Sequence, residues 1–142
     1  MRPRMSAMQA ATILLLSSSN KILMQLRDDG NGKSIPYPNM WNFPGGEKED
    51  GESHLQCVVR EVKEEFNLDI SSKDCEEIFF YQHDEIMDDT VYVCRVEGEP
   101  KLELHEGASI EWMSLEDIKK LDLGFEQHKV IPYIERYLNS GK

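Results

Sequence analysis

The sequence predicts an α/β protein in which a mixed β-sheet lies between layers of helices, an α/β/α sandwich. Short apolar segments of strand length occur both before and after an amphipathic helix at residues 53–66, and helical segments close the chain. Strands and helices interleaved in this way favour layers of helices packed on one sheet. Because the chain has neither an internal repeat nor a break in composition, we expect residues 1–142 to form a single domain.

Two strands and a short third strand are predicted before the helix. The apolar runs at residues 10–16 and 21–26 flank a serine-rich turn at residues 17–20, which favours a hairpin. A loop rich in Gly, Pro and Asn occupies residues 30–40 and leads to a short strand at residues 41–44. The aromatic side chains of this short strand are expected in the core rather than stacked on a ligand.

The helix at residues 53–66 is predicted from its first turn and from two distinct faces. Ser53 and Gln56 form a capping box, in which each side chain accepts a hydrogen bond from the backbone N–H of the other residue. Apolar side chains recur at helical spacing and form one stripe: Leu55, Val58, Val59, Val62 and Phe66. Carboxylates share a second face, centred about 120° away from that stripe: Glu61, Glu64 and Glu65. We therefore expect one face in the core and another face that presents carboxylates together.

A carboxylate-rich helix face has two interpretations. Such faces are often only solvated, and Lys63 lies among these glutamates. However, two carboxylates ~5 Å apart repel by about 3 kcal/mol at an effective dielectric near 20, so a tight cluster favours a bound cation. Hard oxygen ligands of this kind suit Mg²⁺ or Mn²⁺, which also share the oxygens of a phosphate substrate.

The second half of the chain is predicted to contain further strands and two helices. The β-branched and aromatic segments at residues 77–83 and 90–96 favour an antiparallel pair around an acidic turn at residues 84–89. The remaining elements are a loop, a short strand and two helices, at residues 97–106, 110–113, 115–121 and 127–138 in that order.

Charge and cysteine content restrict the partners and the compartment. The net charge of −11 argues against a nucleic-acid polymer or an anionic membrane as the partner, since both require a basic surface. Cys57, Cys75 and Cys94 are odd in number and lack a CxxC pair, so we expect free thiols in a cytoplasmic protein. The four histidines lack the spacing of metal ligands and are predicted to have no functional role: His54, His83, His105 and His128.

The segment around the helix resembles a family signature. From Gly46, a glutamate follows six residues later at Glu52, an arginine eight residues after that at Arg60, and residues 60–65 read REVKEE. This pattern is similar to the Nudix box, the signature of hydrolases that act on a nucleoside diphosphate linked to another group. Asn67 replaces the glycine that usually follows the paired glutamates, and Asn tolerates the left-handed conformation that ends a helix.

The resemblance implies a Nudix fold and a metal-dependent pyrophosphohydrolase. The metal ligands that it implies are glutamates and a glycine carbonyl: Glu61, Glu64, Glu65 and Gly45, with Gly46 as the alternative carbonyl. Mg²⁺ is the implied cofactor, and Mn²⁺ is the alternative. Arg60 is expected to pair with Glu52 and so to orient the catalytic glutamates, because its guanidinium keeps its charge.

The resemblance also implies a general base and substrate contacts outside the box. Glu106 precedes a strand that contains Glu-Trp, as does a loop glutamate that joins the metal site or serves as the base in several Nudix enzymes. Glu61 and Glu106 therefore both stay candidates for the base, with Glu103 and Glu111 as fallbacks. The substrate contacts expected from the resemblance are Arg27, Gly45, Gly46 and Gln127, and Lys33 and Phe125 are weaker candidates.

The implied substrate is a small nucleotide. The leading expectation is an ordinary or oxidised (deoxy)nucleoside triphosphate, cleaved to a monophosphate and pyrophosphate. A nucleotide sugar or ADP-ribose is an alternative, and so is a Nudix domain that binds a nucleotide without hydrolysing it. The Nudix box specifies the type of bond that is cleaved, the diphosphate linkage, but it does not specify the leaving group. Dimers are frequent in the family, so a homodimer is a further expectation.

Overall fold

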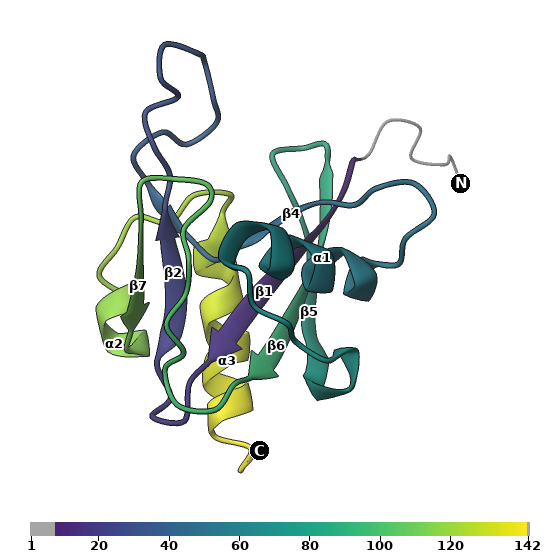
Figure 1. Cartoon of the computed structure of the whole chain (residues 1–142), viewed down its shortest axis with the longest axis vertical. Helices are drawn as coiled ribbons and strands as arrows, with labels where there is room; N and C mark the ends of the chain where they lie inside the picture. The colour runs from purple at the N-terminus through teal and green to yellow at the C-terminus, as the bar shows by residue number, and fades with distance from the viewer. Residues whose placement is uncertain (1–7, 142) are drawn as a thin grey trace.

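The computed structural model describes residues 8–141 and shows a mixed sheet between helices (Figure 1). The strands are β1 (Met8–Leu16), β2 (Ile22–Leu26), β3 (Trp41–Asn42), β4 (Gly45–Glu47), β5 (Cys75–His83), β6 (Met87–Arg95) and β7 (Ser109–Met113). The helices are α1 (His54–Phe66), α2 (Leu115–Ile118) and α3 (Ile131–Leu138), with 3₁₀ turns η1 (Ser72–Asp74) and η2 (Gln127–Val130). None of these helices has the length and apolar composition needed to span a bilayer.

The sheet is organised around β1. Its seven strands follow the order β3-β2-β1-β6-β5, with β4 paired to β1 and β7 paired to β2. β1 runs parallel to β6 along its whole length, and the other pairs are antiparallel, so the sheet is mixed as predicted. β1 and β2 do form the predicted antiparallel neighbours, but only Leu16 and Ile22 pair.

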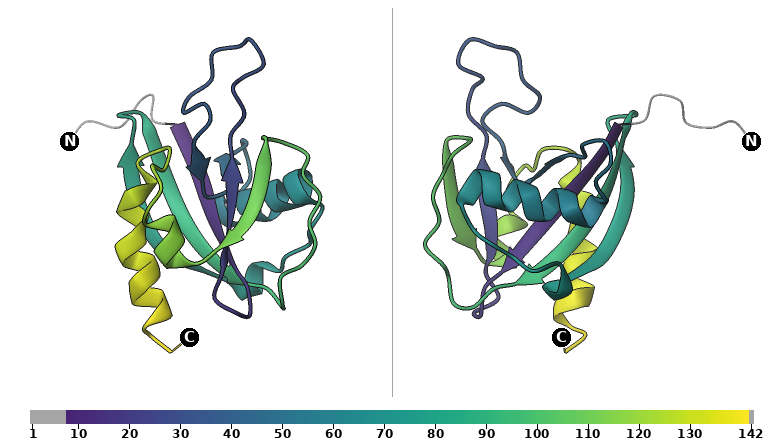
Figure 2. Two further views of the ribbon diagram at one scale, coloured as in Figure 1. Left: turned by 90° about the vertical axis from the view of Figure 1, so that its left-hand side faces the viewer. Right: turned by 45° about the vertical axis from the view of Figure 1, so that its right-hand side comes forward.

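A separate hydrophobic core lies on each face of the sheet. β1 contributes to both, because successive side chains of a strand point to opposite faces. Leu14 and Leu16 pack on the side of α3, whereas Ile13 and Leu15 pack on the side of α1. Figure 2 shows α1 crossing one face of the sheet with α3 behind the other. The predicted α/β/α sandwich is thus confirmed.

The buried face of α1 is narrower than the predicted stripe. Val58, Val62 and Phe66 are fully buried in the core on this side of the sheet. Val59 and Leu55 are only partly buried, because they lie at the margins of the contact between the helix and the sheet.

Several predicted boundaries differ from the structure, and α2 ends at Ile118 rather than at residue 121. The acidic turn after β5 is shorter than residues 84–89, because β6 already begins at Met87 and buries Asp88 and Asp89 beside β1. The last predicted helix is instead the 3₁₀ turn η2 followed by α3. Pro132 explains this division, since a residue without an N–H is tolerated only in the first turn of an α-helix.

One end of the sheet gathers the loops that matter for function. The loop of residues 27–40, drawn in blue, projects beyond β2 at the same end as the turn between β5 and β6 (Figure 1). The opposite end of the sheet holds η1 and the last residues of β6.

Candidate active site

Helix α1 positions the acidic residues, and the predicted cap residues fix its ends. Ser53 Oγ accepts a hydrogen bond from the Gln56 N–H at 3.0 Å, and Gln56 Oε1 accepts one from the Ser53 N–H at 2.8 Å. At the other end Asn67 adopts the left-handed conformation with φ 54°, which is the place that glycine usually fills. The capping box and the substitution of Asn for Gly both agree with the sequence prediction.

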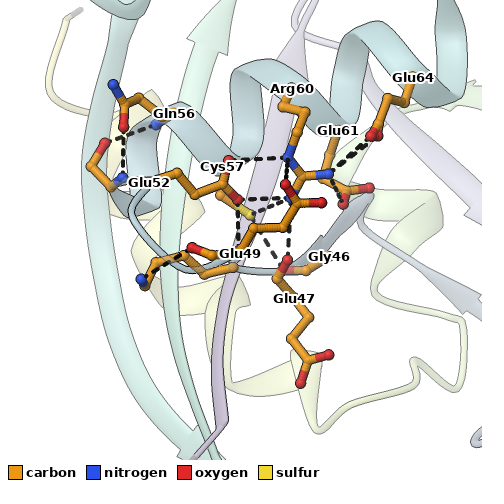
Figure 3. A network of polar contacts seen from close by, with 11 residues as sticks. Gly46, Glu47, Glu49, Glu52, Gln56, Cys57, Arg60, Glu61 and Glu64 are labelled. Carbon is orange, nitrogen blue, oxygen red and sulfur yellow. Dashed lines mark hydrogen bonds and ion pairs between the residues drawn. The ribbon is translucent and has the colours of Figure 1, made fainter.

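Arg60 is the centre of a network of ion pairs with glutamates (Figure 3). Its Nε donates to Glu52 Oε2 at 3.0 Å and its Nη2 donates to Glu52 Oε1 at 2.8 Å, so the predicted pairing is present and bidentate. Its Nη1 donates to Glu61 at 2.9 Å and to Glu64 at 3.0 Å. The hydrogen bonds from Arg60 lower the pKa of Glu52 to about 2.

Glu65 lies in a different environment. It is 6% exposed, and its Oε2 is enclosed without a hydrogen-bond donor. Burial, together with the charges of Glu61 and Glu106, raises the pKa of Glu65 to about 9. Burial also raises the pKa of Glu61. An enclosed carboxylate of this kind is costly unless it takes up a proton or a cation.

The glutamates of α1 are therefore divided between two surroundings, which differs from the shared face predicted. Glu64 is half-exposed against Arg60, Glu65 is buried beside Glu106, and Glu61 interacts with both groups. Within residues 8–141, no three His, Cys, Asp or Glu side chains are arranged to hold a metal ion. The Arg60 guanidinium supplies positive charge to Glu61 and Glu64. The metal ligand set stays a prediction.

Gly45 and Gly46 bring the backbone of β4 against its neighbours. A Cβ at Gly45 would overlap the backbone of Ala11 in β1, and a Cβ at Gly46 would overlap the carboxylate of Glu61. Gly45 is therefore required for close approach to β1, as the sequence suggested, whereas at Gly46 the Glu61 carboxylate could move aside. Their backbone lies within reach of the carboxylate end of the cleft described next.

A cleft gathers most of the predicted site residues. A cavity of ≈ 490 Å³ is lined by predicted residues from five parts of the chain: Arg27, Gly45, Gly46, Glu61, Glu65, Glu106, Phe125 and Gln127. An adjoining cavity of ≈ 340 Å³ shares Arg27 and Glu106 and adds Lys33. Glu52 and Arg60 line neither cavity, which fits an orienting role rather than contact with a ligand.

Glu106 is held at the cleft by backbone contacts of its loop. Its carbonyl accepts a hydrogen bond from Gln25 Nε2 at 2.8 Å, and the Ala108 N–H donates to the Leu26 carbonyl at 2.9 Å. The fallback acids lie elsewhere. Glu103 is exposed and hydrogen-bonds to His105, and Glu111 is exposed beside a different cavity.

The NUDIX domain family model matches residues 7–134 of the chain. The chain belongs to the Nudix family. Its curated relatives include a prenyl-diphosphate phosphatase of Methanosarcina mazei, 26% identical over 79% of this chain, and a putative 8-oxo-dGTP diphosphatase of Bacillus subtilis, 30% identical over 75% of it. The aligned region covers 66% of each of these two relatives, which is less than two thirds of their length.

Solved Nudix structures share the fold. A MutT/nudix family protein from Enterococcus faecalis superposes with a TM-score of 0.77 at 20% identity, covering 98% of this chain and 65% of that chain. The NUDIX domain of NrtR from Shewanella oneidensis, in complex with ADP ribose, superposes with a TM-score of 0.76 at 17% identity, covering 93% of this chain and 88% of that one. At these identities the likeness establishes the fold alone.

In this Nudix chain Arg27 and Phe125 face each other across the cleft. The guanidinium carbon of Arg27 lies 5.0 Å from the centre of the Phe125 ring, and Arg27 Nε donates to the Pro36 carbonyl at 2.9 Å. Tyr37 packs on the same ring, with centroids 4.7 Å apart. Arg27 thus links the loop of residues 27–40 to the segment before η2.

Two buried amides at the Nudix cleft face each other across Phe43. Gln127 Oε1 accepts a hydrogen bond from the Phe43 N–H at 2.7 Å, and Asn42 Nδ2 donates to the Phe43 carbonyl at 2.8 Å. Asn42 Oδ1 is buried without a partner. The sequence analysis assigned Asn42 only to a short strand. Its position next to Trp41 and shortly before Gly45 and Gly46 was the available indication that it lies at the site.

His83 is a second residue that the sequence analysis missed. It is 3% exposed and lines the larger cavity, with Nε2 3.0 Å from Asp89 and Nδ1 2.8 Å from Asp84. Thr12 Oγ1 donates to the other oxygen of Asp89 at 2.9 Å. Although burial lowers the pKa of His83, the hydrogen bonds to Asp89 and Asp84 raise it above its ordinary value overall. His83 and Asp89 pair across the turn between β5 and β6, so no pattern in the neighbouring sequence predicts this contact.

Proposed function

We propose that this Nudix chain is a metal-dependent pyrophosphohydrolase that cleaves the diphosphate linkage of a nucleoside diphosphate linked to another group. Its preferred substrate is an ordinary or oxidised (deoxy)nucleoside triphosphate, which water converts to a nucleoside monophosphate and pyrophosphate. One observation carries the proposal: a single cleft joins the carboxylates of Glu61 and Glu65 to the buried amide of Asn42, whose Oδ1 has no hydrogen-bond partner. The relative named as a putative 8-oxo-dGTP diphosphatase supports the same reaction.

The chemistry of the oxygen donors suits a divalent cation, which would have to compete with Arg60 for Glu61 and Glu64. Glu65 Oε2 is an enclosed oxygen without a donor, and Glu61 and Glu106 add further negative charge beside it. The proposed ligands are Glu61, Glu64, Glu65 and the carbonyl of Gly45 or Gly46, with Mg²⁺ as the preferred ion and Mn²⁺ as the alternative. When bound, the cation would screen the charge of the diphosphate and activate water for attack on phosphorus.

The remaining roles follow from charge and position. Arg27 and Lys33 bring positive charge to the cleft of an acidic protein, which suits an anionic substrate. Arg60 orients Glu61 and Glu64 through its pairing with Glu52. The general base is Glu61 or Glu106, both of which line the larger cavity.

The amides distinguish a nucleotide from other diphosphates. Asn42 Oδ1 is an unused acceptor, and Gln127 lines the same cleft with its Oε1 bound to the Phe43 N–H. A nucleobase offers both donors and acceptors on its edge and a flat face for the Phe125 ring, whereas a prenyl chain offers neither. The cleft therefore favours a base at this end.

A phosphate-release screen with Mg²⁺ and Mn²⁺, and EDTA as the control, tests the proposed function. The panel includes ordinary and oxidised nucleoside triphosphates, ADP-ribose, nucleotide sugars and a prenyl diphosphate. Metal-dependent release of pyrophosphate from a triphosphate is the expected result. Hydrolysis of ADP-ribose or a nucleotide sugar instead would replace the substrate, and thermal stabilisation by nucleotides without turnover would indicate a binding domain.

Asn42→Leu is expected to weaken nucleotide binding. Leu has a similar shape but cannot accept a hydrogen bond from a base, so KM should rise about tenfold with little change in kcat. Steady-state kinetics on the best triphosphate of the screen measure both constants. Asn139→Leu, at an exposed asparagine after α3, is the control. A loss confined to kcat would show that Asn42 does not bind the base.

Glu52→Gln is expected to lower turnover about tenfold, because Arg60 would lose the partner that fixes its guanidinium and, through it, Glu61 and Glu64. The low pKa of Glu52 keeps this pair charged above the ordinary carboxyl pKa, and the pairing is lost only as the pH falls toward 2. Glu49→Gln is a matched control, since Glu49 is 66% exposed and lies 3.6 Å from Arg60 Nε. Equal effects of the two substitutions would contradict the orienting role.

A further inference from the structure

Cys75 and Cys94 occupy directly opposite positions on the antiparallel strands β5 and β6. Both side chains pack on the face of the sheet that α1 covers, so their sulfurs lie on the same side. Both thiols are free in the structure. The sequence analysis treated the three cysteines as unrelated because this pair lies 19 positions apart along the chain, and only the strand register brings them together.

The backbone geometry of such a pair is suited to a bridge. Opposite residues of antiparallel strands have Cα atoms about 4.5 or 5.5 Å apart, depending on their hydrogen bonding. Disulfides span Cα separations of roughly 4.4–6.8 Å, so either case lies within that range. The neighbouring Cys94 thiol also lowers the pKa of Cys75.

The two thiols differ in access, which sets the order in which they react. Cys75 is partly exposed at the start of β5, whereas Cys94 is 2% exposed and lines a surface cavity of ≈ 350 Å³ beside Ser71. The third cysteine, Cys57, is fully buried in α1, and burial raises the pKa of its thiol to about 12. Cys57 is thus an internal reference for an unreactive thiol.

We propose that Cys75 and Cys94 form a reversible disulfide when the protein meets a low-molecular-weight disulfide. The Cys75 thiolate attacks one sulfur of that reagent, forms a mixed disulfide and releases one small thiol. The Cys94 thiol then loses its proton and attacks the Cys75 sulfur, which releases the second small thiol and forms the Cys75–Cys94 bond. Two protein thiols are oxidised, and the small disulfide is reduced to two thiols.

The bridge would act on stability and leave the cleft unchanged. Met87 and Asp89 line the cleft at one end of β6, whereas Cys94 lies at the opposite end beside η1 (Figure 1). A bond there closes a loop through β5, its turn and β6, and so restricts the unfolded chain. Oxidation should therefore raise the Tm by several degrees and change kcat by less than about twofold.

Native protein incubated with oxidised glutathione tests the proposal, with intact mass, thiol counting after denaturation and peptide mapping as readouts. The expected product has lost two hydrogens, keeps one free thiol of three, and contains a peptide that links Cys75 to Cys94. Cys57→Ser should still lose both remaining thiols to the bridge. Cys75→Ser should lose none of its thiols to an internal bridge and show no gain in Tm.

Four results would overturn the proposal. Three free thiols after oxidation would mean that the pair does not react. A stable glutathione adduct at Cys75 would mean that Cys94 cannot reach its neighbour, and an intermolecular link would mean that the cysteines pair between chains. A lower Tm of the bridged form would show that the strand geometry does not accept the bond without strain. All of these readouts are independent of the hydrolase activity.

Discussion

Glu65→Gln is expected to lower kcat/KM on the order of 100-fold or more while the protein stays folded. Glu65 is the most buried carboxylate of the box and lies where Glu61 and Glu106 converge at the cleft. Gln has the same shape but no charge, so the variant should lose affinity for a divalent cation. The measurement is turnover of the best substrate over a range of Mg²⁺ concentrations, together with a circular dichroism spectrum.

The same substitution should raise stability when the metal is removed. The pKa of Glu65 is raised to about 9 in the fold, from the usual carboxyl value near 4.5. Between these two values the unfolded state loses the proton that the folded state keeps, so burying Glu65 costs stability that increases as the pH rises. With EDTA present, the Tm of Glu65→Gln should therefore exceed that of the native chain at pH 8, and the two values should converge near pH 4.

Glu111→Gln is the control for both measurements, because Glu111 is exposed on β7 and lines neither cavity of the candidate site. It should leave turnover and the pH dependence of Tm unchanged. A Glu65→Gln variant with nearly normal turnover in Mg²⁺ would refute the role of Glu65 in the metal site. A variant that binds Mg²⁺ as the native chain does, detected by thermal shift, would refute it independently of activity.

Val62→Asp is expected to unfold the domain. Val62 is fully buried between α1 and the sheet, and Asp would replace its apolar contacts with a charge that has no partner in this core. The cost is about 4 kcal/mol or more, which is a large part of the ~5–15 kcal/mol that stabilises a typical domain. Chemical denaturation should show little or no folded protein.

Val59→Asp is the matched control, because it makes the same substitution one helical turn away at a partly buried position. Its cost should be about 1 kcal/mol, with a cooperative unfolding transition retained. If both variants unfold equally, α1 is buried more widely than the structure indicates. A well-folded Val62→Asp protein would mean that the faces of α1 are assigned the wrong way round.

The sequence predicted the structure best at α1 and at its two ends. The capping box of Ser53 and Gln56, the left-handed Asn67 and the bidentate pair of Arg60 with Glu52 all depend on residues within eight positions of each other. Local spacing decides contacts of this kind, because these residues lie on α1 or directly beside its ends. The sandwich was also predictable, since the alternation of apolar runs and an amphipathic helix allows few other arrangements.

The sequence was least informative where packing chooses among equivalent residues. Helical spacing puts Glu61, Glu64 and Glu65 on one face, but the docking of α1 against the sheet buries Glu65 and leaves Glu64 at Arg60. Spacing cannot reveal this division, because the division depends on the orientation of α1 relative to the sheet and to the loop that carries Glu106.

The family, the box and the ends of α1 could be read from the order of residues, because these depend on residues near one another in the chain. The packing of the whole chain sets which distant groups share a surface. It brought His83 to Asp89, left Asn42 Oδ1 unpaired at the cleft, and placed Cys75 opposite Cys94. Strand register and loop packing bring such distant residues into contact, and the free energy that selects these contacts is distributed over the whole core.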